Sequence, residues 1–494
     1  MKFISTRGRS QVDCAATAIA KGLADDGGLF VPQTFPTISM DDITKMTEMD
    51  YAERACFVLH KYLEEYDYQD LLTACKNSYS KFEDNDGAPL VKIDDKTFIM
   101  ELFHGPTLAF KDVALTLLPY LLRKGCDLSG IKEEVLILVA TSGDTGKAAL
   151  EGFKDAKGIK VMVFFPSEGV SDMQKMQMTT QEGDNVNVVA VEGNFDDCQT
   201  AVKKIFTSKE IASDLLKKGI VLSSANSMNF GRLAPQITYY FSAYADLLSS
   251  GEIELGDKVN FVVPTGNFGN ILAGYYAKQM GLPIDKLVCA SNSNNVLTEF
   301  FANGTYDANR EFFKTVSPSM DILISSNLER LVFELSNRDF ELTEKRMAEL
   351  KELGKYTLTD SEKKKLDADF FADYCDEEEC LQTIGEVFDE YGYVLDTHTA
   401  VAYDVAMNFV DYTKNEKPVI VLSTASPYKF AHDVLRAING SAPTDAFKCA
   451  YKLNEQTANP IPNQISQLKN KEKRFNKVIN KNDTVSAVME FVER

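Results

Sequence analysis

Residues 259–276 read VNFVVPTGNFGNILAGYY, and this stretch contains the pattern that decides the fold. The mostly apolar run 259–264 suits a buried strand, and the residues after Asn270 suit a helix. Two glycines lie in the turn between them, where backbone N–H groups can converge. An apolar strand, a glycine-rich turn and a helix in this order are typical of one unit of an α/β sheet.

The same pattern recurs in both directions along the chain. Further apolar runs are VLILVA (135–140), KVMVFF (160–165), VNVVAV (186–191), KLVCAS (286–291) and PVIVLSTAS (418–426). Strands that alternate with helices pair in parallel and are covered on both faces. The sequence therefore predicts an α/β fold with parallel-type sheets covered by helices. Ligands of such sheets bind beyond the carboxyl ends of the strands, so the turns after these runs are candidate sites.

The predicted elements divide the chain into four regions. Residues 1–85 read as a helical N-terminal domain, and NDGAPL at 85–90 marks its boundary. We expect a large α/β domain over 90–122 and 222–445, a small α/β domain over 123–221, and a peripheral C-terminal segment over 446–494. The charged stretch 341–379 is expected to be a solvated surface insertion.

Composition restricts the class of function. Of 494 residues, 53 are Lys or Arg and 73 are Asp or Glu, which gives a formal charge of −20. Recognition of nucleic acid needs a basic surface, so we expect no nucleic-acid partner. A small anionic substrate is still compatible with this charge, because a pocket can be locally positive on an acidic protein.

The chain offers few groups that could hold a metal. Its nine cysteines are scattered and never spaced C-x-x-C, which argues against a disulfide framework and for a reducing compartment. No two of the four histidines lie within one helical turn, so no metal site is predicted.

No apolar run reaches about 20 residues, and MKFISTRGRSQ lacks a signal-peptide core. We expect no membrane span and a cytoplasmic location.

The most informative single residue is Lys111, in ELFHGPTLAFKDVALTLLPYLL (101–122). Residues 107–122 are apolar nearly all round, which predicts one buried helix starting near Pro106. A buried lysine tends to lose its proton, and a neutral lysine is the nucleophile that forms Schiff bases with carbonyl compounds. The alternative is that Lys111 reaches the surface and pairs with an acid such as Asp112.

The turn at 266–270 is a candidate phosphate cradle. Its glycines and the start of the following helix would direct N–H groups toward an anion. The G-x-G-x-x-G pattern of dinucleotide sites and the Gly-Lys-Ser/Thr of Walker loops are both absent. A plain tight turn is the alternative.

Two more segments could bind anions. The hydroxyls and amides of TSGDTGK (141–147) suit a carboxylate, although Asp144 or Ser142 could instead cap the next helix. In SSANSMNFGRLAPQ (223–236), Arg232 could fork onto a phosphate or make a surface salt bridge. Two anion cradles and an arginine fit a substrate and a cofactor that both carry anionic groups.

Taken together, these motifs resemble the threonine synthase family, in its longer microbial and fungal branch. The resemblance extends from Ser5 to about residue 440. The motifs that carry it are HGPTLAFKD (104–112), TSGDTG (141–146), the glutamine- and methionine-containing run 166–178, NFDDCQ (194–199), PTGNFGN (264–270), SPSMDILISSNLER (317–330) and LSTASP (422–427).

The resemblance implies a pyridoxal-phosphate enzyme of the tryptophan-synthase-β fold type. Lys111 would bond covalently to the cofactor and act as acid and base, and Thr424 would hydrogen-bond the pyridine nitrogen. The cofactor phosphate would be held by Gly266, Asn267, Phe268, Gly269 and Asn270. The substrate carboxylate would be held by Thr141, Ser142, Gly143, Asp144 and Thr145, and the substrate phosphate by Ser227 and Arg232, with Lys147 and Asn327 as further contacts.

Three positions depart from the patterns that the resemblance brings with it. Asp144 stands where the wider fold type often has Asn, and Ser426 and Tyr428 stand where the family often has His and Ala. We therefore assign Asp144 no contact with the cofactor's ring hydroxyl.

The implied reaction converts O-phospho-L-homoserine and water into L-threonine and phosphate. One alternative is a related phospho-lyase that releases 2-oxobutyrate, which differs only in the last steps. An alternative of another class is a non-catalytic binding protein on the same scaffold, against which the retention of Lys111, both loops and Thr424 argues. The third, a nucleotide-dependent kinase, is disfavoured by the missing Walker spacing. The sequence does not give the oligomeric state, and a monomer is the working expectation.

Overall fold

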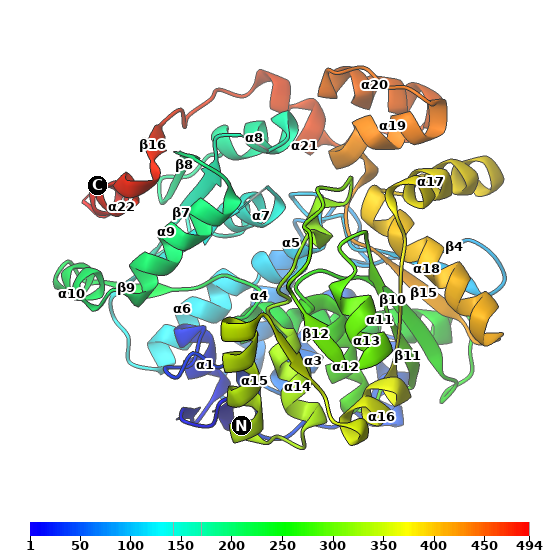
Figure 1. Ribbon diagram of the computed structural model, residues 1–494, viewed down its shortest axis with the longest axis horizontal. Coiled ribbons are helices and arrows are strands. Elements are labelled where there is room, and N and C mark those ends of the chain that lie inside the picture. Colours follow the sequence, from blue (N-terminus) through cyan, green and yellow to red (C-terminus); the bar gives the residue numbers. More distant parts are fainter. Residues whose placement is uncertain (142, 169, 494) are drawn as a thin grey trace.

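Figure 1 shows the computed structural model of the chain, which describes residues 1–141, 143–168 and 170–493. Two sheets dominate the described chain. The larger contains, in spatial order, β14 (Phe370–Tyr374), β11 (Ile284–Ser291), β10 (Val259–Pro264), β15 (Val419–Ser423), β5 (Thr97–Glu101) and β4 (Leu90–Lys92). The smaller contains β16 (Val478–Asn480), β8 (Val186–Glu192), β7 (Ile159–Pro166), β6 (Glu134–Ala140) and β9 (Ile220–Ser223).

Neighbouring strands in both sheets are parallel, apart from β4 and β5. Those two strands form a hairpin, and a short turn can only join antiparallel neighbours. All six residues of β10 are buried, as expected for a strand that helices cover on both faces. The predicted α/β fold with parallel-type sheets is therefore confirmed.

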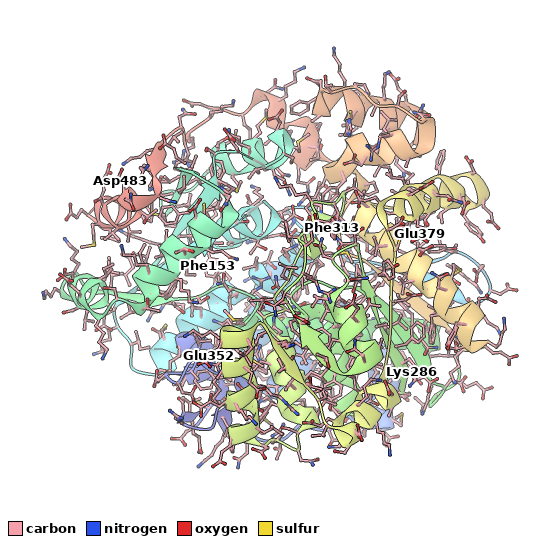
Figure 2. All side chains as sticks on the ribbon, viewed as in Figure 1. Phe153, Lys286, Phe313, Glu352, Glu379 and Asp483 are labelled. Atoms are coloured by element: carbon pink, nitrogen blue, oxygen red, sulfur yellow. The ribbon has the colours of Figure 1, made fainter. Side chains whose placement is uncertain are left out.

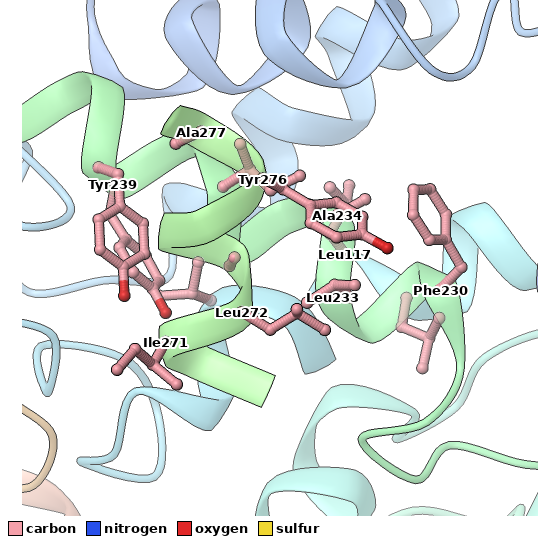
Figure 3. Packing of buried hydrophobic residues seen from close by; sticks show 14 of the residues in the cluster. Leu117, Phe230, Leu233, Ala234, Tyr239, Ile271, Leu272, Tyr276 and Ala277 are labelled. Carbon is pink, nitrogen blue, oxygen red and sulfur yellow. The ribbon is translucent and has the colours of Figure 1, made fainter. Parts of the chain in front are cut away.

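Alternate side chains of the large sheet enter two different cores. Phe261 and Val263 pack in a cluster with α11 (Phe230–Ser249) and α12 (Gly269–Gln279), whereas Val262 packs in a cluster with α18 (Thr397–Thr413). This division follows from the two-residue period of a strand. Figure 3 shows the first cluster from close by, with Leu233 of α11 beside Leu272 of α12. This buried packing fixes the helix ends that carry the site described below.

The remaining elements are shorter or lie outside the two sheets. The N-terminal region has three strands, β1 (Phe3–Ser5), β2 (Gln11–Val12) and β3 (Phe30–Pro32), and four helices, α1 (Ala15–Lys21), α2 (Met40–Met46), α3 (Tyr51–His60) and α4 (Tyr68–Tyr79). Helices of the middle region are α5 (Lys111–Leu115), α6 (Leu118–Leu128), α7 (Asp144–Gly152), α8 (Asp172–Thr179), α9 (Phe195–Thr207), α10 (Lys209–Lys217), α13 (Val296–Asn303), η1 (Pro318–Met320), α14 (Leu328–Leu335), α15 (Phe340–Leu353), α16 (Asp360–Asp369) and α17 (Glu377–Tyr391). A small ribbon joins β12 (Thr305–Asp307) to β13 (Lys355–Thr357), and the C-terminal helices are η2 (Pro427–Phe430), α19 (Ala431–Asn439), α20 (Ala446–Thr457), α21 (Asn463–Ser466), η3 (Leu468–Asn470), η4 (Lys481–Asp483) and α22 (Thr484–Val492).

The single helix predicted over 107–122 is wrong. Two helices stand there, α5 from Lys111 and α6 from Leu118. Leu108 has a φ of 61°, which stops helix formation before Lys111. Pro119 has no N–H to donate to the preceding turn, so it ends the first helix and occupies the start of the second.

The stretch 341–379 is also more than a solvated insertion. Most of it is helical, but β14 lies within it and pairs with β11 at the edge of the large sheet. Cys375, directly after β14, is fully buried. Because the stretch is highly charged, its hydrophobic pattern did not indicate the short strand β14.

Acidic side chains are spread over the surface. Figure 2 labels Glu352, Glu379 and Asp483, which are exposed on α15, α17 and η4 respectively. The net charge therefore comes from separate elements. Among the described residues, no helix has the length and apolar character that crossing a membrane requires.

Candidate active site

The predicted site residues lie where strands end and helices begin. Lys111 follows β5, Thr141 follows β6, Gly266 follows β10 and Thr424 follows β15. The loops after β5 and β15 are joined directly, because the N–H of Phe110 donates to the carbonyl of Thr424 at 2.9 Å. The large sheet thus brings Lys111, Gly266 and Thr424 to one edge, and Thr141 follows a strand of the small sheet.

Lys111 is the first residue of α5, and its side chain is only 11% exposed. Its Nζ lies 4.7 Å from the centre of the Phe110 ring and 3.8 Å from a carboxylate oxygen of Asp144. Burial lowers the pKa of Lys111 to about 8, with the positive charges of Lys429 and Arg232 adding to the effect and Asp144 opposing it. At pH 8 about half of such amines are neutral, against fewer than about 1% at the ordinary value.

The alternative that Lys111 reaches the surface beside Asp112 is wrong. Asp112 is itself buried, and its carboxylate accepts hydrogen bonds from the N–H and the hydroxyl of Thr107 at 2.7 and 2.6 Å. These bonds hold the turn that precedes α5. Burial raises the pKa of Asp112 to about 6, with the Thr107 hydrogen bonds opposing the rise.

Asp144 binds a lysine that the sequence analysis missed. Its carboxylate accepts from Lys429 Nζ at 2.8 Å and from Gln174 at 3.0 Å, and the Lys429 side chain is 1% exposed. The positive charges of Lys429 and Lys111 hold the pKa of Asp144 well below its usual range despite its burial. Lys429 could have been noticed from its place, since it follows the carboxyl end of an apolar run.

Asp144 does not cap helix α7. The hydroxyl of Thr141 accepts from the N–H groups of Gly143 and Gly146, both at 3.0 Å. Asp144 is the first residue of the helix and turns to Lys429, so it is not the cap. Ser142 lies outside the described residues. The predicted carboxylate role of this helix start, including Thr145 in its first turn, stays a prediction.

The turn at 266–270 has the features of an anion cradle. Phe268 has a φ of 62°, and Gly269 begins the 11-residue helix α12. Tyr239 and Tyr240 both donate to Oδ1 of Asn270, which fixes the amide so that Nδ2 is free to donate. That buried Nδ2 has no partner among the described residues.

Arg232 is buried without a counter-ion in the described part of the chain. Its Nη1 donates to the carbonyl of Ala225 at 2.6 Å, and its Nε has no partner there. Burial lowers the pKa of Arg232 to about 10. The alternative of a surface salt bridge is therefore wrong, and a buried, unpaired guanidinium fits an anionic ligand.

Three further predicted residues differ in their placement. Asn327 donates to the hydroxyl of Ser227 at 3.2 Å and to the carbonyl of Asn267 at 2.9 Å, so Ser227 and Asn327 lie at the cradle. Lys147 is instead held by Glu151 at 2.9 Å and by Gln181. Within the residues that the structure describes, no hydrogen bond of the Lys147 side chain reaches another predicted site residue, and its role toward substrate stays a prediction.

These residues fit pyridoxal phosphate. A buried amine of lowered pKa suits its aldehyde, the helix start with the free Asn270 donor suits its phosphate, and the buried hydroxyl side chain of Thr424 suits a ring nitrogen. One group of potential metal ligands occurs elsewhere in the described chain: ligand atoms of Cys375, Glu379 and Asp404 lie within 4.8 Å of one another.

Three family models cover most of the chain. "Threonine synthase N terminus" matches residues 2–79, "Pyridoxal-phosphate dependent enzyme" matches 86–353, and "Threonine synthase, C-terminal" matches 399–492. The predicted cofactor, pyridoxal phosphate, is confirmed by the second of these matches.

Alignments with known proteins also cover most of this chain. Human "Threonine synthase-like 1" is 43% identical over 455 residues; the match covers 88% of this chain, and the chain spans only 60% of that relative. Threonine synthase of Pseudomonas aeruginosa is 37% identical over 481 residues, covering 95% of this chain and 97% of the relative. The crystal structure of pyridoxal-phosphate-bound threonine synthase from Brucella melitensis matches with a TM-score of 0.88 and 37% identity, covering 100% of this chain and 98% of that one. The chain belongs to the threonine synthase family of pyridoxal-phosphate-dependent enzymes.

Proposed function

We propose that this protein is a threonine synthase, which converts O-phospho-L-homoserine and water into L-threonine and phosphate. The observation that carries the proposal is the buried Arg232, whose guanidinium has no counter-ion among the described residues and whose charge acts on Lys111. An anionic group placed there would stand close to the reactive amine. A phosphate ester on the substrate supplies such a group.

The reaction requires protons to move at two neighbouring carbons of the substrate. Pyridoxal phosphate, when bound, supplies a conjugated ring that stabilises negative charge next to the amino group. Lys111 Nζ, neutral in part near pH 8, can take the proton from the α-carbon and move protons at the β-carbon. Arg232 and Ser227 would hold the phosphate ester while phosphate leaves, and the amides at the start of α7 would hold the α-carboxylate.

The test is the identity of the product. Purified protein incubated with O-phospho-L-homoserine should release phosphate and form threonine in equal amounts. Release of phosphate with 2-oxobutyrate would replace the proposal with the phospho-lyase alternative. Absence of phosphate release from cofactor-loaded protein would favour the non-catalytic alternative.

Two variants connect the result to the site. Lys111→Ala should lose the visible band and the borohydride-trappable bond to the cofactor together with phosphate release. Lys147→Met is the matched control, because the Lys147 side chain is similarly shielded, at 13% exposed, but is held by Glu151. It should keep the trappable bond.

We also propose a cytoplasmic location, a monomer, and no nucleic-acid partner, supported by the net charge of −20 and the dispersed cysteines. The proposed division remains 1–85, 90–122 with 222–445, 123–221, and 446–494. The two separate parallel sheets support it, although β16 of the last segment pairs with β8 of the small sheet.

A further inference from the structure

The motif SPSMDILISSNLER (317–330) lies against the phosphate cradle at its first turn, η1. A Cβ placed on Gly266 would stand 2.7 Å from the carbonyl oxygen of Ser319 and 3.3 Å from the Cα of Met320. Backbone atoms this close leave Gly266 no room to move toward η1. The position of Ser319 therefore braces one end of the cradle, and what holds Ser319 also shapes the cradle.

Ser319 is held by His398. Its N–H donates to His398 Nε2 at 3.1 Å, and His398 Nδ1 lies 2.9 Å from Oδ1 of Asp396. A backbone N–H can only donate, so this network requires an unprotonated Nε2 and places the ring proton on Nδ1. His398 is 2% exposed and Asp396 is fully buried, so water cannot readily replace these bonds.

Two chains of contacts, here called arms, start at Asp396. The first runs through His398 to Ser319, and the second starts at the other carboxylate oxygen. It accepts from the hydroxyl of Thr399, and that hydroxyl lies 2.9 Å from Oγ of Ser423. Ser423 ends β15 and directly precedes Thr424, the residue expected at the pyridine nitrogen. Thr399 is fully buried, and Ser423 is nearly so.

We propose that Asp396 is a positioning residue that holds both ends of the cofactor site. Through His398 and Ser319 it braces the phosphate cradle, and through Thr399 and Ser423 it sets the ring end at Thr424. It acts through these neighbours without touching the cofactor. The proposal depends on the cofactor site alone, so failure of the proposed reaction would leave it standing.

The two arms make different predictions for two probes. Full-length apoprotein is titrated with pyridoxal phosphate and with pyridoxal, which lacks the phosphate, and formation of the visible band is followed. His398→Ala should weaken pyridoxal phosphate about 10-fold and leave pyridoxal within about 2-fold, because the Ser319 N–H loses its acceptor and this change lies at the cradle only. Thr399→Val should weaken both ligands by about the same factor and shift the band, because its arm ends at the ring.

Conservative variants separate positioning from folding. His398→Gln keeps an acceptor that can reach the Ser319 N–H and should restore most of the affinity for pyridoxal phosphate, whereas His398→Asn, which is too short to reach it, should not. Thr399→Ser keeps the hydroxyl and should behave like the parent. Thermal unfolding of each apoprotein shows which variants fold, and should His398→Ala not fold, the Gln and Asn pair replaces it.

The proposal is overturned if His398→Ala and Thr399→Val weaken the two probes in the same proportion. It is also overturned if the His398 variants lower apoprotein stability while leaving the affinity for pyridoxal phosphate unchanged, since His398 would then be merely structural. Asp396→Asn, which perturbs both arms, should weaken pyridoxal phosphate more than either single-arm variant, and a smaller effect would count against Asp396 as their common anchor.

Discussion

Replacing Lys429 with methionine should make Lys111 harder to deprotonate. Asp144 now lies between two ammonium groups, 2.8 Å from Lys429 Nζ and 3.8 Å from Lys111 Nζ. At an effective dielectric constant of about 20, a charge pair 3.8 Å apart attracts by about 4 kcal/mol. Burial and the positive charges of Lys429 and Arg232 offset that attraction for Lys111.

Removal of Lys429 takes away one of the positive charges that lower the pKa of Lys111. Asp144 then interacts with Lys111 as its only nearby ammonium group among the described residues. The pKa of Lys111 should then rise from about 8 by about 1 to 2 units. Because only the neutral amine adds to an aldehyde, the variant should bind pyridoxal phosphate covalently about 8-fold to 75-fold more slowly at pH 7.5. Above the raised pKa the two proteins should react at similar rates.

The assay is the rate at which apoprotein forms the visible band after mixing with pyridoxal phosphate, measured from pH 6 to 11. Repeating the series with pyridoxal removes the ionisation of the phosphate. Lys147→Met serves as control, since it also removes a largely shielded lysine, within α7, but leaves the Asp144 pair intact. A midpoint for Lys429→Met at or below that of the parent would refute the reasoning.

Three further predictions concern other charges and one glycine. Arg232→Met should raise the KM for O-phospho-L-homoserine at least about tenfold while cofactor loading, read from absorbance, is unchanged; loss of the cofactor would mean that Arg232 holds the cofactor's own phosphate. Arg346→Met should lower the free energy of unfolding, measured by urea titration, by about 3 to 5 kcal/mol. Glu362 is buried and accepts two charged hydrogen bonds from Arg346 at 2.7 and 2.6 Å, which the variant would lose. Gly266→Ala should weaken pyridoxal phosphate more than pyridoxal in binding titrations, because the new methyl group would lie 2.7 Å from the carbonyl of Ser319.

Apolar runs predicted most strands of the two sheets, because a strand that is buried on both faces is a continuous run of apolar residues in the sequence. The run VNFVVP at 259–264 matches β10 at both ends, and VLILVA at 135–140 misses only the first residue of β6. β14 was missed because it is an edge strand inside a charged stretch, so only part of its surface is buried. The pattern of hydrophobic residues reports burial, and edge strands offer less of it.

The site was predicted less completely than the fold. Motifs singled out Lys111, Asn270 and Arg232; the structure buries Asn270 and Arg232 and leaves the Lys111 side chain 11% exposed, and their roles stay predictions. Lys429 was missed because its partner Asp144 is 285 positions away by number, and no local pattern reports such a pair. The Lys147 pairing could have been predicted, since Glu151 stands four residues later on the same helix face.

The pairing of β16 with β8 has a consequence for synthesis of the chain. β8 is made early, whereas residues 478–480 emerge from the ribosome much later. Until then the backbone groups along one side of β8 lack their partner, and an unpaired strand can associate with other nascent chains. Chaperone occupancy on translating ribosomes should therefore persist until the last strand has been added.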